Sequence, residues 1–139
     1  MIRIRSEAWR VILAHARASY PEECCGVLIG EARAGIGVAE AQPFENASTD
    51  SRRSHYALRP SQLLAADRDA RARGLAIVGV YHSHPDGGTV FSPEDLANAW
   101  SWYFYFVLSI RNGEFAGAAA WMADGMPVAA RELPVLIEP

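Results

Sequence analysis

The sequence predicts an α/β domain in which one curved mixed β-sheet is flanked by about three helices. Segments with the period of a strand alternate with helix-like segments, and glycine, proline and Asn-Gly or Asp-Gly pairs separate them. Half of the 139 residues are apolar, which is enough to form one core. Since no repeat, low-complexity tract or linker divides the chain, we expect a single domain over residues 1–139.

The first half of the chain contains two helical segments separated by strands and a polar loop. Ser6 is a favourable N-cap, Pro60 suits the first turn of a helix, and Gly74 provides a C-terminal stop. In chain order, we expect a helix at 6–19, strands at 24–30 and 36–41, a loop at 43–54, a short strand at 55–58 and a helix at 60–74.

The second half is richer in strands. The apolar run 76–80 predicts that a strand at 75–82 is central in the sheet and covered on both faces. The elements expected next are a Gly-rich loop at 85–91, a helix beginning at Ser92-Pro93, strands at 102–110, 114–122 and 128–137, and turns at Asn112-Gly113 and Asp124-Gly125. Functional side chains are therefore to be sought where the central strand ends.

Charge and cysteine content exclude several classes of protein. The net charge is −3, and the thirteen Lys and Arg residues form no cluster longer than Arg52-Arg53, so we expect neither nucleic acid nor an anionic membrane as partner. The longest apolar stretch, 102–110, is too short to cross a bilayer, and we expect a cytoplasmic protein. Cys24 and Cys25 are adjacent, which disfavours a disulfide between them; in a strand they are small buried side chains on opposite faces.

A candidate metal site follows the central strand. His82 and His84 are two residues apart, so a strand places both imidazoles on the same face, where two ring nitrogens can bind one ion. Asp95, in the first turn of the next predicted helix, can supply a carboxylate as third ligand. Three nitrogen and oxygen ligands with an open fourth position are typical of catalytic zinc, whereas structural zinc sites are usually closed and rich in cysteine.

Each of these residues also has a simpler interpretation. Histidine pairs at this spacing are common on strands, and Ser92 with Asp95 matches a helix capping box, although one carboxylate can both bind a metal and accept a backbone hydrogen bond. His15 is interpreted as a helix residue without a role, and His55 as a plain strand residue, with contact to a substrate as the alternative. The aromatic run 100–106 is interpreted as sheet core, with an interface as the alternative.

Taken together, three segments resemble the signature of the JAMM or MPN+ metalloprotease family. These segments are Glu23-Cys24-Cys25-Gly26, His82-Ser83-His84-Pro85 and Ser92-Pro93-Glu94-Asp95. No signature position is missing, and the order of elements fits almost the full chain. The resemblance implies an MPN fold with a cytidine-deaminase-like layout. Glu23 is preferred to Glu22 as the family's glutamate because two small apolar residues and a glycine follow it; Glu22 remains the alternative.

The resemblance implies a zinc-dependent peptidase or isopeptidase. It assigns Zn²⁺ to His82, His84 and Asp95. Glu23 would be the general base that activates the zinc-bound water, and Ser92 would donate a hydrogen bond to the oxyanion. A glutamate with a pKa of about 4.3 is a poor base toward free water, whose pKa is about 15.7, but zinc lowers the pKa of bound water to about 7.

The substrate implied by the resemblance is the C-terminal tail of a ubiquitin-like protein. We expect no accessory domain, and in this the chain is similar to the small bacterial members that trim ubiquitin-fold sulfur carrier proteins. We expect the tail to bind as an added strand along a sheet edge, with loop 43–54 as one wall. A non-catalytic MPN scaffold is disfavoured because all ligands are present. A zinc nucleoside deaminase is disfavoured because its His-x-Glu and Pro-Cys-x-x-Cys elements are absent.

Overall fold

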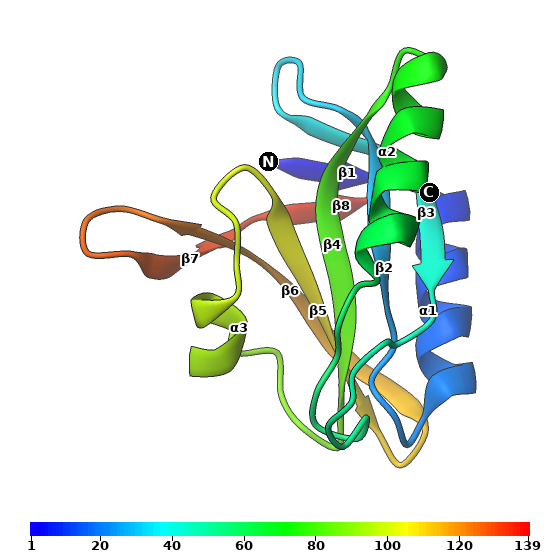
Figure 1. Cartoon of the computed structure of the whole chain (residues 1–139), viewed down its shortest axis with the longest axis vertical. Helices are drawn as coiled ribbons and strands as arrows, with labels where there is room; N and C mark the ends of the chain where they lie inside the picture. The colour runs from blue at the N-terminus through cyan, green and yellow to red at the C-terminus, as the bar shows by residue number, and fades with distance from the viewer.

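One mixed sheet of eight strands organises the polypeptide, which is described over residues 1–139 by a computed structural model (Figure 1). The strands are β1 (Ile2–Ile4), β2 (Cys25–Glu31), β3 (Ile36–Phe44), β4 (Ala76–Pro85), β5 (Phe104–Arg111), β6 (Glu114–Asp124), β7 (Ala129–Leu133) and β8 (Val135–Ile137). The helices are α1 (Ser6–Ser19), α2 (Pro60–Ala72) and α3 (Pro93–Ala97). The order in the sheet is β7-β6-β5-β4-β2-β3-β1-β8. This is the fold class that the sequence predicts.

The predicted central position of the strand after α2 is confirmed. β4 pairs antiparallel with β2 and parallel with β5, so both of its edges are hydrogen-bonded. Helices cover the two faces of the sheet (Figure 1). Ile12 of α1 packs in the core that contains Tyr81, whereas Ala66 of α2 packs in the core that contains Ile77. The end of β4 is therefore bonded to β5 as far as Pro85 and to the chain of β2 as far as Ser83.

The two cysteines lie on opposite faces of the sheet, as the sequence predicts. Cys24 is part of the core beneath α1, and Cys25 is part of the core beneath α2. Both thiols are buried and free. Separately, none of the helices combines the length and the apolar character needed to cross a membrane.

Several predicted elements extend further than expected. β3 continues to Phe44, through Pro43, so the predicted loop begins two residues later than its first expected residue. β4 continues to Pro85, which places both candidate ligands inside the strand. The Asn112-Gly113 hairpin turn is confirmed, and both residues have positive φ angles, 52° and 81°, as such two-residue turns require.

Two predictions about strands are wrong or incomplete, and one strand was not predicted. Residues 55–58 do not form a strand, because their backbone groups bond to Asn46 and Ala47 rather than to a ladder. The segment 128–137 forms two strands, since Pro134 interrupts it; β7 pairs with β6, and β8 crosses to β1 at the other side of the sheet. β1 was not predicted, because its three residues are ordered by pairing with distant strands.

Only the second half of the aromatic run 100–106 belongs to the sheet core. Phe104, Tyr105 and Phe106 are buried in β5. Trp100 and Trp102 precede the strand, remain 44% and 66% exposed, and stack on each other with ring centroids 5.6 Å apart. The prediction of sheet core therefore holds for the strand residues but not for the two tryptophans.

Candidate metal centre

Two histidine side chains converge at the end of β4. His82 and His84 are separated by one residue, and the alternation of the strand directs both toward the same face. Their Nε2 atoms lie 3.1 Å apart. The side chain of His82 is fully buried, and that of His84 is 17% exposed. The predicted meeting of the two imidazoles on one face is confirmed.

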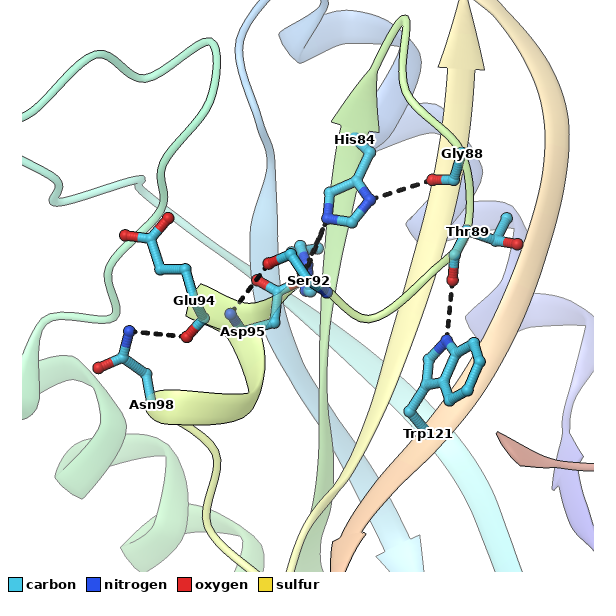
Figure 2. Close-up of polar contacts among 9 residues, drawn as sticks. His84, Gly88, Thr89, Ser92, Glu94, Asp95, Asn98 and Trp121 are labelled. Carbon is cyan, nitrogen blue, oxygen red and sulfur yellow. Dashed lines mark hydrogen bonds and ion pairs between the residues drawn. The ribbon is translucent and has the colours of Figure 1, made fainter. Parts of the chain in front are cut away.

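Asp95 joins the two histidines from the first turn of α3. Ser92 caps this helix: its Oγ accepts a hydrogen bond from the Asp95 N–H at 3.0 Å, and its own N–H donates to Asp95 Oδ2 at 3.1 Å. The same Oδ2 atom lies 3.2 Å from the Nε2 atoms of His82 and His84. Figure 2 shows His84 directed from β4 toward Ser92 and Asp95. The capping box is present, and it aims the carboxylate at the imidazoles.

The positions of the three atoms fit a divalent cation. His82 Nε2, His84 Nε2 and Asp95 Oδ2 form a nearly equilateral triangle with edges of 3.1 to 3.2 Å. A tetrahedral zinc ion with ligand distances of 2.0–2.1 Å has ligand-to-ligand edges of about 3.3 Å. Two imidazoles and one carboxylate are also ligand types that zinc accepts. These residues are therefore able to hold a metal ion.

The charges at the centre also favour a cation. Burial lowers the pKa of His82, which keeps its imidazole neutral and able to donate a lone pair. Burial opposes the charged form of His84 too, but the hydrogen bond and charge of Asp95 raise the pKa of His84 above its ordinary value. Burial would raise the pKa of Asp95, yet the hydrogen bonds from both histidines hold that pKa below its ordinary range. The result is a buried carboxylate that attracts positive charge.

Different contacts orient the two imidazoles. His84 Nδ1 lies 3.0 Å from the carbonyl oxygen of Gly88, a hydrogen bond of the kind that usually fixes a metal-binding histidine. His82 Nδ1 is buried without any hydrogen-bond partner. Its ring instead stacks on Tyr56, with centroids 4.4 Å apart and planes at 20°. Packing thus replaces hydrogen bonding as the support of His82.

The loop between β4 and α3 is anchored to the neighbouring strands. Trp121 of β6 donates its indole N–H to the carbonyl of Thr89 at 2.8 Å (Figure 2). Ser109 of β5 donates its hydroxyl to the carbonyl of Gly87. These bonds fix the course of the loop that brings α3 back to the histidines.

Glu23 lies two residues before the start of β2 and lines the same cavity as His84 and Asp95. It is only 6% exposed, whereas Glu22 is exposed and does not line this cavity. Burial raises the pKa of the Glu23 carboxyl to about 8; His84 opposes this shift, and the negative charge of Asp95 adds to it. Of the two neighbouring glutamates, only Glu23 lines the cavity that His84 and Asp95 also line.

Ser83 is a residue whose contribution the sequence analysis missed. It lies between the two histidines, and its side chain points to the opposite face of β4. Its Oγ accepts a hydrogen bond from the Cys24 N–H at 2.9 Å, and its N–H donates to the Cys24 carbonyl at 3.2 Å. These bonds extend the β2–β4 pairing by one residue and fix the chain next to Glu23. The signal in the sequence is the hydroxyl residue between two candidate ligands.

Ser92 has a hydroxyl proton free for a further contact. Its Oγ accepts from the Asp95 N–H but donates to no group of the protein. The residue lines the same cavity as Glu23. A ligand oxygen in the cavity can therefore accept a hydrogen bond from Ser92 without breaking the helix cap.

A cavity of about 740 Å³ opens over the centre and is bounded by residues between 47 and 58, by the start of α3 and by β4. Residues 47–50, 53 and 54 of the predicted polar loop line this cavity. His55 lines it too, with Nε2 3.6 Å from Glu94 Oε1, and it is not the strand residue that we predicted. His15 lies outside the cavity, and its Nδ1 is 2.8 Å from the hydroxyl of Tyr81.

Comparison with known proteins identifies relatives over most of the chain. Residues 5–124 match the model of the prokaryotic homologues of the JAB domain. The chain is 33% identical to desampylase from Haloferax volcanii over 142 residues, a match that covers 99% of this chain and 96% of that protein. It is also 34% identical over 96 residues to tail tip assembly protein K of Escherichia phage N15, covering 69% of this chain and 35% of that protein.

Solved structures with the same fold include two solution structures of bacterial proteins. One, from Desulfitobacterium hafniense, has a TM-score of 0.86 and 26% identity, and the match covers 99% of this chain and 93% of the other. The second, from Salinibacter ruber, has a TM-score of 0.74 and 29% identity, with coverage of 98% and 91%. The likeness extends over nearly the whole length of each of these chains.

Proposed function

Because the chain belongs to the family of prokaryotic JAB-domain homologues, we propose that it is a zinc-dependent hydrolase that cleaves peptide or isopeptide bonds at the tail of a ubiquitin-like protein. The family match and the full-length relative confirm the family that the sequence signature predicts. One observation carries the proposal: the ligand atoms of His82, His84 and Asp95 converge beside a cavity that His84, Asp95 and Glu23 line. A domain that only binds other proteins has no need of this convergence.

The proposed mechanism divides the work between the metal ligands and Glu23. When bound, a zinc ion supplies a Lewis acid that polarises a carbonyl and brings the pKa of water from about 15.7 to about 7. His82, His84 and Asp95 would hold the ion and leave one position open to the cavity. The Glu23 carboxylate would take a proton from the attacking water and deliver it to the leaving amine.

Ser92 is proposed to stabilise the oxyanion that develops on the scissile carbonyl. Its hydroxyl has no acceptor within the protein, and the helix cap holds its Oγ in place. A single donor of this kind typically contributes about 10²- to 10³-fold to kcat. The assignment is supported by this unpaired hydroxyl and by the position of Ser92 in the cavity wall.

The substrate class is proposed from the relative and from the shape of the cavity. Desampylase, the relative that matches over its full length, is named for removal of a ubiquitin-like protein. A sulfur carrier protein of ubiquitin fold is our more specific proposal for this chain. The two edge strands of the sheet are β7 and β8, whereas β2 and β4 lie inside it, which favours the cavity over a sheet edge as the place where the tail binds; binding as an added strand stays a prediction. An extended tail would lie instead in the cavity, against the wall formed by residues 47–58.

We also propose that the protein acts in the cytoplasm. The two cysteines are free and buried, which is the usual state of thiols in a reducing compartment.

Cleavage of a defined fusion tests the proposed function. The substrate would be a ubiquitin-fold sulfur carrier protein extended at its C-terminus by a short peptide, incubated with protein that carries one equivalent of zinc. We expect release of the peptide, loss of cleavage after chelation, and recovery when zinc is restored. A protein that neither binds zinc after reconstitution nor cleaves the fusion would instead be the non-catalytic scaffold.

A further inference from the structure

We propose that Asn46 is the positioning residue of Glu23: its side-chain amide clamps the segment 46–57 onto the chain just before β2 and so holds the carboxyl in the cavity. The inference rests on the proposed function in one respect, since it takes Glu23 as the base. The segment 46–57 contains no regular secondary structure, so its shape depends on contacts of this kind.

Every hydrogen-bonding position of the Asn46 amide is used. Nδ2 donates to the carbonyl of Glu23 at 3.1 Å and to the carbonyl of His55 at 2.9 Å. Oδ1 accepts from the N–H of Ser48 at 3.0 Å and from the N–H of Ala57 at 3.2 Å. Two carbonyls on one side and two N–H groups on the other allow only this orientation of the amide.

Glu23 is attached to the segment through both of its main-chain groups. Its N–H donates to the carbonyl of Arg52 at 2.7 Å, and its carbonyl accepts from Asn46. The N–H of Ala47 donates to the carbonyl of Ala57 at 3.0 Å, which closes the base of the segment. The backbone that carries the Glu23 carboxyl is therefore set by the segment as much as by β2.

The residue types nearest in size and polarity do not reproduce the four contacts of Asn46. Aspartate has the shape but lacks the two donors, serine has a single hydroxyl, and glutamine is longer by one methylene. The same amide also fixes Ala57, which follows Tyr56, the residue whose ring stacks on His82. The side chain of Asn46 therefore bonds both to the main chain of Glu23 and to the residue that follows Tyr56, the support of His82.

Asn46→Asp tests the clamp with the least change in shape. The variant keeps the acceptor for Ser48 and Ala57 but places an oxygen against the carbonyls of Glu23 and His55, which repels them. We expect kcat for the carrier-protein fusion to fall about 10- to 100-fold, because a displacement of about 1 Å can cost 10²-fold. KM and zinc content should stay within threefold of the wild type. Asn46→Ala, which removes the donors without adding charge, replaces the variant if it does not fold.

Asn112→Asp is the matched control for the added negative charge. Asn112 is exposed in the turn between β5 and β6, and its side chain makes no hydrogen bond. We expect kcat, KM and zinc content of this variant to match the wild type. An equal fall of kcat in Asn112→Asp and Asn46→Asp would assign the loss to charge and overturn the clamp.

A double-mutant cycle separates positioning of Glu23 from a general loosening of the cavity. If Asn46 acts through Glu23, adding Asn46→Asp to Glu23→Gln should lower the residual kcat by less than twofold. Multiplication of the two losses would show that Asn46 acts independently of the base and would overturn the proposal.

Hydrogen–deuterium exchange of the zinc-loaded protein provides a readout that does not depend on activity. In Asn46→Asp we expect faster exchange in peptides that cover Glu23 and residues 46–57, and unchanged exchange in β5 and β6. Unchanged exchange around Glu23 in Asn46→Asp would overturn the clamp, whatever the activity of the variant. If the wild type cleaves no fusion but Asn46→Asp still shows the faster exchange, the proposed function is rejected and the clamp stands.

Discussion

The two sides of the metal centre are held by different kinds of structure. On the ligand side, His82 and His84 belong to β4, which is hydrogen-bonded along both edges, and a capping box fixes Asp95. On the base side, Glu23 lies just outside β2, against the segment 46–57, which has no regular structure. A sheet supports the first side redundantly, whereas a few side-chain bonds support the second. Binding of the metal and use of the metal should therefore be separable by mutation.

The largest expected effect comes from removing ligands. In a His82→Ala, His84→Ala double variant, only one of the three ligand atoms remains, so we expect less than about 0.1 equivalent of zinc and no measurable hydrolysis. Zinc content would be measured by plasma mass spectrometry beside wild type, which should carry about one equivalent. Full zinc content in the double variant would show that the metal binds elsewhere and that His82 and His84 are not its ligands.

Glu23→Gln should impair the base side of the centre and leave zinc binding by the ligand side unchanged. The amide keeps the shape but cannot accept the proton, so we expect kcat to fall about 10²- to 10⁴-fold while one equivalent of zinc stays bound. The measurement is steady-state cleavage of the carrier-protein fusion together with zinc content. Glu22→Gln is the matched control and should retain wild-type kcat, because Glu22 is exposed and lies outside the cavity. A loss of kcat in Glu22→Gln with wild-type kcat in Glu23→Gln would assign the role of base to Glu22.

The sequence predicts the ligand side almost completely, for a physical reason. The alternation of a strand aligns His82 with His84, and a helix cap is a local pattern, so spacing places Ser92 and Asp95 at a helix start. The resemblance to the JAMM signature then assigns these residues to one site. The central strand, the hairpin at Asn112-Gly113 and most helix limits are also local patterns. The same reasoning places them correctly.

The base side was less accessible from the sequence because its supports are contacts between distant residues. Asn46 reaches Glu23 across 23 positions, and Tyr56 reaches His82 from outside any regular element. The failed prediction of a strand at 55–58 has the same origin, since the backbone there bonds to Asn46. β1 and β8 were missed as separate strands because each is ordered by a partner far along the chain.

The burial of Glu23 should appear as a pH-dependent cost in the stability of the metal-free protein. The pKa of Glu23 is raised from an ordinary value of 4.5 to about 8. Below pH 4.5 the carboxyl is protonated in both the folded and unfolded states and costs nothing. Between pH 4.5 and 8 the unfolded chain releases this proton more readily, so stability falls as pH rises. We expect the free energy of unfolding of metal-free Glu23→Gln to exceed that of the wild type by on the order of 2–4 kcal/mol at pH 8.5. At pH 5 the difference should be much smaller.

Urea unfolding of the metal-free variants at the two pH values measures this difference. Glu22→Gln, at the exposed neighbouring position, is the control and should change stability little at either pH. A gain in Glu23→Gln that is equal at pH 5 and pH 8.5 would show that the carboxyl is not desolvated in the folded protein. The base side would then be open to water, contrary to the structure.

The smallest expected effect separates the supports of the two histidines. His84 is oriented by the Gly88 carbonyl, whereas His82 depends on stacking against Tyr56 because its Nδ1 has no partner. In Tyr56→Leu we expect zinc affinity to fall about tenfold, at the lower end of the losses known for outer contacts of metal ligands. Competition with a chromophoric chelator measures this affinity. Tyr56→Phe keeps the ring and should bind zinc as wild type does. Unchanged affinity in Tyr56→Leu would mean that β4 alone aims His82, and that the ligand side needs nothing from the segment 46–57.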